Sequence, residues 1–192
     1  MNIEQYLSEL DALSEYRRVH SLNVSKEAVR FAEKYGADVE KARLAGLLHD
    51  VTKETDGDKQ LQIIEKGGII LSETEKRSPK LWHAISGACY VRDVLGIDDP
   101  DIFNAIRFHT TARAGMSVLE KVVFLADFTS AERDYPDIDI IREHAENSLE
   151  EGMLYGLKFT LSRLIGRGNL VSPDALAAYN EILLSEELRN KN

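Results

Sequence analysis

Signals that start and stop helices recur along the whole chain and constrain its fold more than any other feature. A capping residue followed by proline is typical of a first helical turn, and it occurs at Ser78-Pro79, Asp99-Pro100 and Ser172-Pro173. Gly36 and Gly96 stand where apolar residues with helical spacing end. Stretches with the alternation of a β-strand are nearly absent. We therefore expect an all-α protein, folded as a helical bundle.

The chain shows no internal boundary that would divide it into several domains. Its 192 residues suffice for one domain with a sizeable core, and no repeat, low-complexity tract or linker interrupts them. We expect a single domain over residues 1–192, with a core at about 16–134 and C-terminal helices at 138–186 packed on it. The short apolar run at 68–71 resembles a strand, but a buried loop explains it equally well.

Charge and cysteine content limit the classes of partner and compartment. The chain has 24 Lys+Arg and 33 Asp+Glu, and a net charge of −9 disfavours a long basic surface for nucleic acid. Its one cysteine, Cys89, cannot form an intrachain disulfide, which suits a reducing cytoplasm. The first residues do not resemble a signal peptide, and no apolar stretch approaches the roughly 20 residues of a membrane helix. We expect a cytoplasmic protein without nucleic-acid or membrane partners.

Imidazole and carboxylate side chains recur in an order that predicts a metal site. His49 and Asp50 are adjacent after an apolar run, and Asp127 follows five apolar residues. An unpaired buried carboxylate is costly, so Asp127 needs a partner. A lone histidine or a His-Asp dipeptide is weak evidence, and the ordered set carries the prediction. These groups together suit a borderline divalent metal. The predicted ligands are His20, His49, Asp50, His83, His109 and Asp127.

The adjacency of His49 and Asp50 restricts how the ions can be arranged. Neighbours on a straight helix point about 100° apart, so binding one ion would strain the helix unless the pair lies at its end. The strain also eases if Asp50 bridges two ions while His49 binds one, with the other ligands on separate helices. Two ions about 3.5–4 Å apart would activate water for attack on phosphorus. The first ion would take His20, His49, Asp50 and Asp127, and His83 and His109 would bind a second ion or the phosphate.

Extended segments surround these ligands: 47–53 (LLHDVTK), 82–84 (WHA), 105–111 (AIRFHTT), 120–127 (EKVVFLAD) and 133–136 (RDYP). Together they resemble the HD-domain metal phosphohydrolases, an all-helical superfamily, and more narrowly the YqeK family. The resemblance covers residues 16–184 and implies a symmetrical diadenosine tetraphosphate hydrolase that uses iron and releases two ADP. Mn, Co or Zn would also suit the ligand types. Residues 128–132 look less typical than their flanks.

A polyphosphate substrate needs cations in addition to the metal. Lys53 lies three residues after Asp50 and would neutralise phosphate charge, although its spacing equally fits a solvated lysine beside Glu54. Arg17 lies one turn before His20 on the same face and suits a bidentate phosphate contact, with Arg18 as its competitor. We predict catalytic roles for Asp50, Lys53 and His109. The predicted substrate contacts are Arg17, His20, Lys53, His83, His109, Thr110, Arg133 and, through the resemblance, Ser172.

Three other functions remain open at this point. A related HD enzyme could hydrolyse guanosine tetraphosphate, a deoxynucleotide or a cyclic nucleotide. A nucleotide-binding regulator could retain the ligands without turnover, but the intact set of ligand types favours an enzyme. A helical scaffold would bind no metal. The oligomeric state is also open, and a homodimer is compatible with an acidic helical protein.

Overall fold

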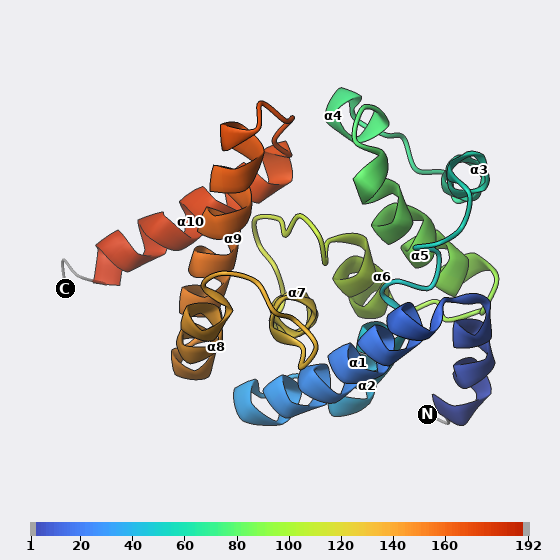
Figure 1. Cartoon of the computed structure of the whole chain (residues 1–192), viewed down its shortest axis with the longest axis horizontal. Coiled ribbons are helices and arrows are strands. Elements are labelled where there is room, and N and C mark those ends of the chain that lie inside the picture. The colour runs from blue at the N-terminus through green and yellow to red at the C-terminus, as the bar shows by residue number, and fades with distance from the viewer. Residues whose placement is uncertain (1–2, 190–192) are drawn as a thin grey trace.

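The chain folds into helices, as the recurring start signals predicted. The structure is a computed structural model that describes residues 3–189, with side chains through residue 185, and no strand occurs in that part of the chain (Figure 1). The elements are η1 (Ile3–Ala12), α1 (Glu15–Tyr35), α2 (Val39–Leu48), α3 (Gly57–Lys66), α4 (Glu73–Lys76), η2 (Pro79–Leu81), α5 (Trp82–Asp93), α6 (Pro100–Arg107), α7 (Val118–Thr129), α8 (Ile138–Asn147), α9 (Leu149–Gly166) and α10 (Pro173–Arg189). Neither η1 nor α4 was predicted.

Local capping explains where several helices begin and end. Gly36 ends α1 in the left-handed region, at φ 77°, where a side chain would be strained. Asp99 caps α6 by accepting hydrogen bonds from the backbone N–H of Asp101 and Ile102. Ser117 and Glu120 form a reciprocal capping box at the start of α7. These contacts lie within a few residues of one another, which is why they can be predicted from sequence.

Three local predictions need correction. Ser78 makes no capping hydrogen bond, because its ψ of 74° turns it away from the extended conformation of a cap, and a 3-10 turn precedes α5. That helix ends at Asp93, before the predicted boundary at Leu95. The apolar run at 68–71 is a loop, but it is not buried, and Ile70 is 93% exposed.

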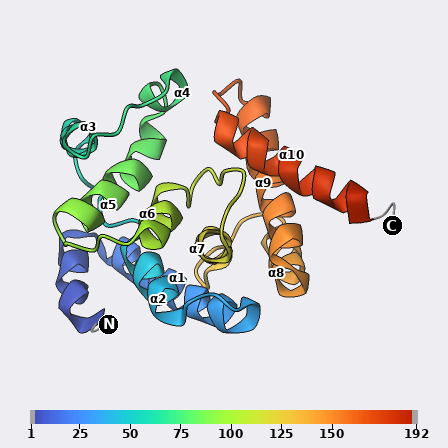
Figure 2. The same ribbon diagram turned by 180° about the vertical axis from the view of Figure 1, so that it is seen from behind.

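α7 is the central helix of the bundle. Its residues from Val122 to Ala126 are at most 1% exposed, as expected for a helix that is apolar all round. It packs against α1, α2 and α6 on one side and against α9 on the other. Figures 1 and 2 show α7 between the helices that precede it and the group α8–α10. The domain limits of 1–192 extend beyond the described residues and stay a prediction.

α1 and α2 approach each other closely, and this approach brings two candidate ligands together. Gly46 on α2 permits it: a Cβ there would lie 3.0 Å from Ser25 Cα and 3.1 Å from the Val24 carbonyl oxygen on α1. His20 lies in the same helix α1, and His49 follows the last residue of α2. Among the described helices, none has the length and apolar character required to span a membrane.

Candidate metal centre

Four of the predicted ligands meet between α1, the end of α2, and α7. His20 Nε2 lies 3.2 Å from His49 Nε2 and 3.1 Å from Asp127 Oδ1. Asp50 Oδ2 lies 3.8 Å from His20 Nε2 and 3.7 Å from His49 Nε2. Nitrogen and oxygen ligands bind an ion at roughly 2.0–2.2 Å, so ligands of one ion are themselves about 3–3.5 Å apart. The observed separations are therefore close to those of a shared ion.

The remaining two histidines surround the other oxygen of the same aspartate. Asp50 Oδ1 lies 3.2 Å from His83 Nε2 and 3.6 Å from His109 Nε2. The two imidazole nitrogens are 3.3 Å apart. Asp50 thus presents one oxygen to each group of histidines, which is the arrangement that a bridging carboxylate requires.

Three of these side chains follow the ends of helices. α2 stops at Leu48, so His49 and Asp50 lie where the backbone leaves the helix, as the geometry of adjacent ligands required. His109 lies in the turn after α6 rather than on a helix, which corrects the expectation that the other ligands sit on separate helices. The turn after Asp50 is tied to α5, because Thr52 Oγ1 donates a 2.9 Å hydrogen bond to the His83 carbonyl.

The buried residues of the cluster fit a divalent cation. Asp50 Oδ1 is buried and has no hydrogen bond of good geometry from the part of the chain that the structure describes, and the Lys53 ammonium lies 3.5 Å from it. A buried carboxylate oxygen without a donor is costly, and a cation would supply the missing partner. Imidazole nitrogen and carboxylate oxygen are the donor types that transition metals share. The cluster can therefore bind a divalent metal.

Burial and neighbouring charges hold several ligands in the protonation state that a metal needs. Burial lowers the pKa of His49 to about 3 and that of His83 to about 4, so both are neutral near pH 7. Burial alone would raise the pKa of Asp50 and of Asp127. The pKa of each carboxyl nevertheless stays well below its usual range, because His49 lies beside Asp50 and because His20 and Arg133 contact Asp127.

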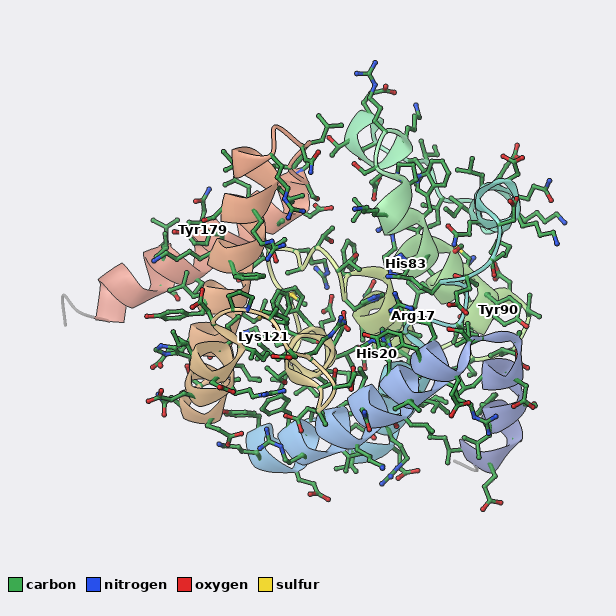
Figure 3. All side chains as sticks on the ribbon, in the orientation of Figure 1. Arg17, His20, His83, Tyr90, Lys121 and Tyr179 are labelled. Carbon is green, nitrogen blue, oxygen red and sulfur yellow. The ribbon has the colours of Figure 1, made fainter. Side chains whose placement is uncertain are left out.

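Three basic side chains line the side of the cluster that is open to solvent. Arg17 Nη1 lies 3.1 Å from Asp50 Oδ2, and Lys53 Nζ lies 2.9 Å from His83 Nε2. Arg133 donates to the Asp127 carbonyl at 2.9 Å and also to its carboxylate. The exposed fractions of these side chains are 24% for Arg17, 27% for Lys53, 27% for Arg133 and 16% for Asp127. Figure 3 shows Arg17 beside His20 and His83.

The surroundings decide whether Lys53 faces the cluster or is a solvated lysine beside Glu54, and whether Arg17 or Arg18 faces the cluster. Glu54 accepts hydrogen bonds from Ser14 N and Oγ at 2.6 and 2.7 Å, whereas the Lys53 ammonium faces Asp50 and His83. Burial lowers the pKa of Lys53, as expected for a side chain that points into the site. Arg18 instead pairs with Asp11 at 2.9 Å.

In the described part of the chain, two of the predicted substrate contacts have no hydrogen bond or ion pair with the cluster. Among the described residues, no hydrogen bond or ion pair joins Thr110 or Ser172 to a ligand, and Ser172 lies at the start of α10. Two cavities of about 220 and 410 Å³ lie elsewhere and are lined by none of the six ligands. The roles of Thr110 and Ser172 stay predictions.

One side chain at the site was not predicted. Glu132, in the turn after α7, accepts a hydrogen bond from His20 Nδ1. Burial alone would raise the pKa of Glu132, but hydrogen bonds from Ser130, His20 and Asn23 lower it to about 2, so it is ionised near pH 7. His20 and Glu132 are 112 residues apart, and no sequence spacing links them.

Comparison with known proteins agrees with this geometry. The HD domain family matches residues 17–132. A protein of Halalkalibacterium halodurans named symmetrical bis(5′-nucleosyl)-tetraphosphatase is 38% identical over 91% of this chain and 93% of its own length. Its namesake in Bacillus subtilis is 36% identical over 94% of this chain and 97% of its own.

A solved structure has the same fold. A Clostridium acetobutylicum protein, described as a predicted HD superfamily hydrolase involved in NAD metabolism, superimposes with a TM-score of 0.92 at 35% identity. The match covers 96% of this chain and 98% of the other. The chain therefore belongs to the HD-domain family and, within it, to the YqeK-like group together with the relatives named symmetrical bis(5′-nucleosyl)-tetraphosphatase.

Proposed function

We propose that this protein is a metal-dependent hydrolase that cleaves diadenosine tetraphosphate symmetrically into two ADP. Relatives that carry this name align over 91% and 94% of the chain. The observation that carries the proposal is the ring of Arg17, Lys53 and Arg133 around the open side of a buried His/Asp cluster. A polyphosphate brings several negative charges, and these cations can neutralise them beside the metal.

The proposed roles follow from the direction in which each group points. His20, His49, Asp50 and Asp127 would bind the first ion, and His83 and His109 would bind a second ion or contact the phosphate. A bound divalent metal supplies an activated water and polarises the phosphoryl oxygens. Lys53 faces Asp50 Oδ1 and His83, so its ammonium is placed for charge that develops on a leaving phosphate.

Several finer points belong to the same proposal. We propose iron as the physiological metal, with Mn, Co or Zn as ions that the same donors accept. The substrate is a small nucleotide, and the protein would act in the cytoplasm. Symmetric cleavage requires the pocket to place the second phosphorus from the held nucleoside at the metals. Thr110 and Ser172 would contribute to that pocket.

A panel of substrates tests the proposal. Purified protein loaded with Fe²⁺ or Mn²⁺ is offered diadenosine tetraphosphate, guanosine tetraphosphate, a deoxynucleotide, a cyclic dinucleotide and NAD, and products are separated by ion-exchange chromatography. We expect ADP as the sole product from diadenosine tetraphosphate. Asp50→Ala should abolish turnover, whereas Arg18→Ala, next to Arg17 but paired with Asp11, should not change it. Cleavage of a cyclic dinucleotide with none of diadenosine tetraphosphate would refute the assignment.

A further inference from the structure

The histidines of the cluster obtain their orientation in two different ways. His49 Nδ1 donates to the Gly46 carbonyl at 2.8 Å, and His109 Nδ1 donates to the Ile106 carbonyl at 2.7 Å. Both carbonyls belong to the last four residues of a helix, whose C=O groups have no intrahelical partner. The end of α2 and the end of α6 therefore supply an acceptor locally, and each ring turns its Nε2 toward the cluster.

His20 cannot be held in this way because it lies inside α1. The carbonyls of the preceding turn are used by the hydrogen bonds of the helix itself. The acceptor for its Nδ1 is instead the Glu132 carboxylate, which comes from the turn after α7. With Nδ1 donating to Glu132, Nε2 is the nitrogen that faces the cluster, 3.1 Å from Asp127 Oδ1, and its lone pair is available to a metal when the ring is neutral. The other tautomer would direct an N–H into the metal position.

Glu132 is itself fixed at both oxygens. Ser130 Oγ donates to Oε1 at 2.7 Å, and Asn23 Nδ2 donates to Oε2 at 2.7 Å. Asn23 lies on α1, one turn after His20, so the carboxylate joins α1 to the end of α7. Its side chain is only 15% exposed. A carboxylate with both oxygens engaged in this way is a rigid support and not a solvated surface acid.

We propose that Glu132 is a positioning residue that fixes the tautomer and ring orientation of His20 for metal binding. Carboxylates beside ligating histidines have this effect in other metal sites, where they set the ring and raise the basicity of the ligand. The next residue, Arg133, holds Asp127 through its carbonyl and carboxylate. The turn at 130–133 therefore sets two ligands of the first group together. This inference rests on the metal centre of the proposed function.

Metal affinity tests the inference without relying on turnover. Full-length protein is stripped with a chelator, and its Mn²⁺ affinity is measured by competition with a fluorescent chelator. We expect Glu132→Ala to weaken binding by about 10- to 100-fold. Glu132→Gln should recover most of the affinity, because its amide oxygen can accept from His20 while Asn23 turns its own amide oxygen to the new NH₂. Glu75→Gln, a buried glutamate paired with Arg107 outside the cluster, should bind as wild type does.

The tautomer of His20 gives a second readout. In ¹⁵N-histidine-labelled protein loaded with diamagnetic Zn²⁺, long-range ¹H–¹⁵N spectra should show His20 protonated at Nδ1 with Nε2 bound to the metal in wild type, and this pattern should be lost in Glu132→Ala. If that variant does not fold, Ser130→Ala, which removes one support of Glu132, should give a smaller loss of Mn²⁺ affinity. Unchanged affinity in folded Glu132→Ala, or a Gln variant as weak as Ala, would overturn the role of Glu132. Wild type that binds no Mn²⁺ would instead overturn the metal centre.

Discussion

Replacing Gly46 by alanine should weaken metal binding as well as the fold. The new Cβ would lie 3.0 Å from Ser25 Cα, 3.1 Å from the Val24 carbonyl oxygen and 3.2 Å from Ala28 Cβ, whereas ordinary contact begins at 3.4 Å. Two of these three atoms belong to the backbone of α1, so they cannot move aside by a change of rotamer. α2 must therefore move away from α1 by a few tenths of an ångström.

The cost to stability is modest because two effects oppose each other. Overpacking costs about 1–3 kcal/mol. Alanine is favoured over glycine inside a helix by about 1 kcal/mol, which offsets part of that cost. The net loss is about 0–2 kcal/mol, which corresponds to a fall in Tm of at most about 8 °C in a chain of this size.

The metal centre should also lose affinity because metal–ligand distances tolerate little change. His49 follows α2 directly and donates to the Gly46 carbonyl, so it moves with that helix relative to His20. Ligand distances vary by only about ±0.2 Å in functional sites. A displacement of 1 Å costs roughly 100-fold in activity, so we expect about a 10-fold loss of Mn²⁺ affinity.

Gly152→Ala is the matched control. A Cβ at this position would lie 2.8 Å from Ala145 Cα, between α8 and α9, with no ligand of the cluster on either helix. Urea unfolding gives the stability of each stripped variant, and chelator competition gives its Mn²⁺ affinity. Both variants should lose comparable stability, but only Gly46→Ala should lose affinity. Equal, wild-type affinity in both would show that the spacing of α1 and α2 does not set the ligand separation.

Three further predictions follow from the same contacts. Removing the metal with a chelator should lower Tm by about 10 °C relative to protein with free metal at 1,000 times its Kd, since the bound metal then contributes about 4 kcal/mol. Scanning calorimetry of Asp50→Asn should show no such effect of the chelator. Lys53→Met should lower kcat/KM about 10²- to 10³-fold in steady-state assays while the metal content of the protein stays unchanged. If the variant instead loses its metal, Lys53 supports the metal centre and does not act on the phosphate. Glu75 has a folded pKa below its ordinary 4.5, because hydrogen bonds from Ser72 and Arg107 outweigh burial. The stabilisation from this ionised carboxylate is present above pH 4.5 and is lost as pH falls through the folded pKa. In urea unfolding of stripped protein, the free energy of unfolding should be about 1–3 kcal/mol lower for Glu75→Gln than for wild type, and this difference should shrink in acid. A difference that stays constant with pH would contradict the lowered pKa.

Features that depend on neighbouring residues were predictable from the sequence. The cap at Asp99 and the stop at Gly36 involve contacts within a few residues, and both occur where expected. The expectation of a buried loop at 68–71 was wrong, because apolar residues are buried only where another element covers them, and Ile70 remains exposed. Whether a loop is covered depends on packing between distant segments, which local composition does not encode.

Gly46 illustrates information that was present in the sequence but needed the structure for its meaning. A glycine inside α2 costs about 1 kcal/mol relative to alanine, so its presence there indicates a reason outside the helix. The reason is the contact with the backbone of α1 at Ser25 and Val24. A glycine where a helix would favour alanine marks the position as unusual, but the sequence does not show which segment packs against it.

The groups that orient the histidine ligands also differ in how far they can be predicted from sequence. His49 and His109 follow helix ends, so the carbonyl three residues earlier is the natural acceptor for each ring, and this can be predicted once the helix boundary is known. A histidine inside a helix has no such carbonyl, so its acceptor must come from another segment. His20 is in this position, and its acceptor, Glu132, lies in the segment 128–132 that looked less typical of the family than its flanks. In a helical metal centre, a ligand in the middle of a helix is thus the place to search for a long-range positioning carboxylate.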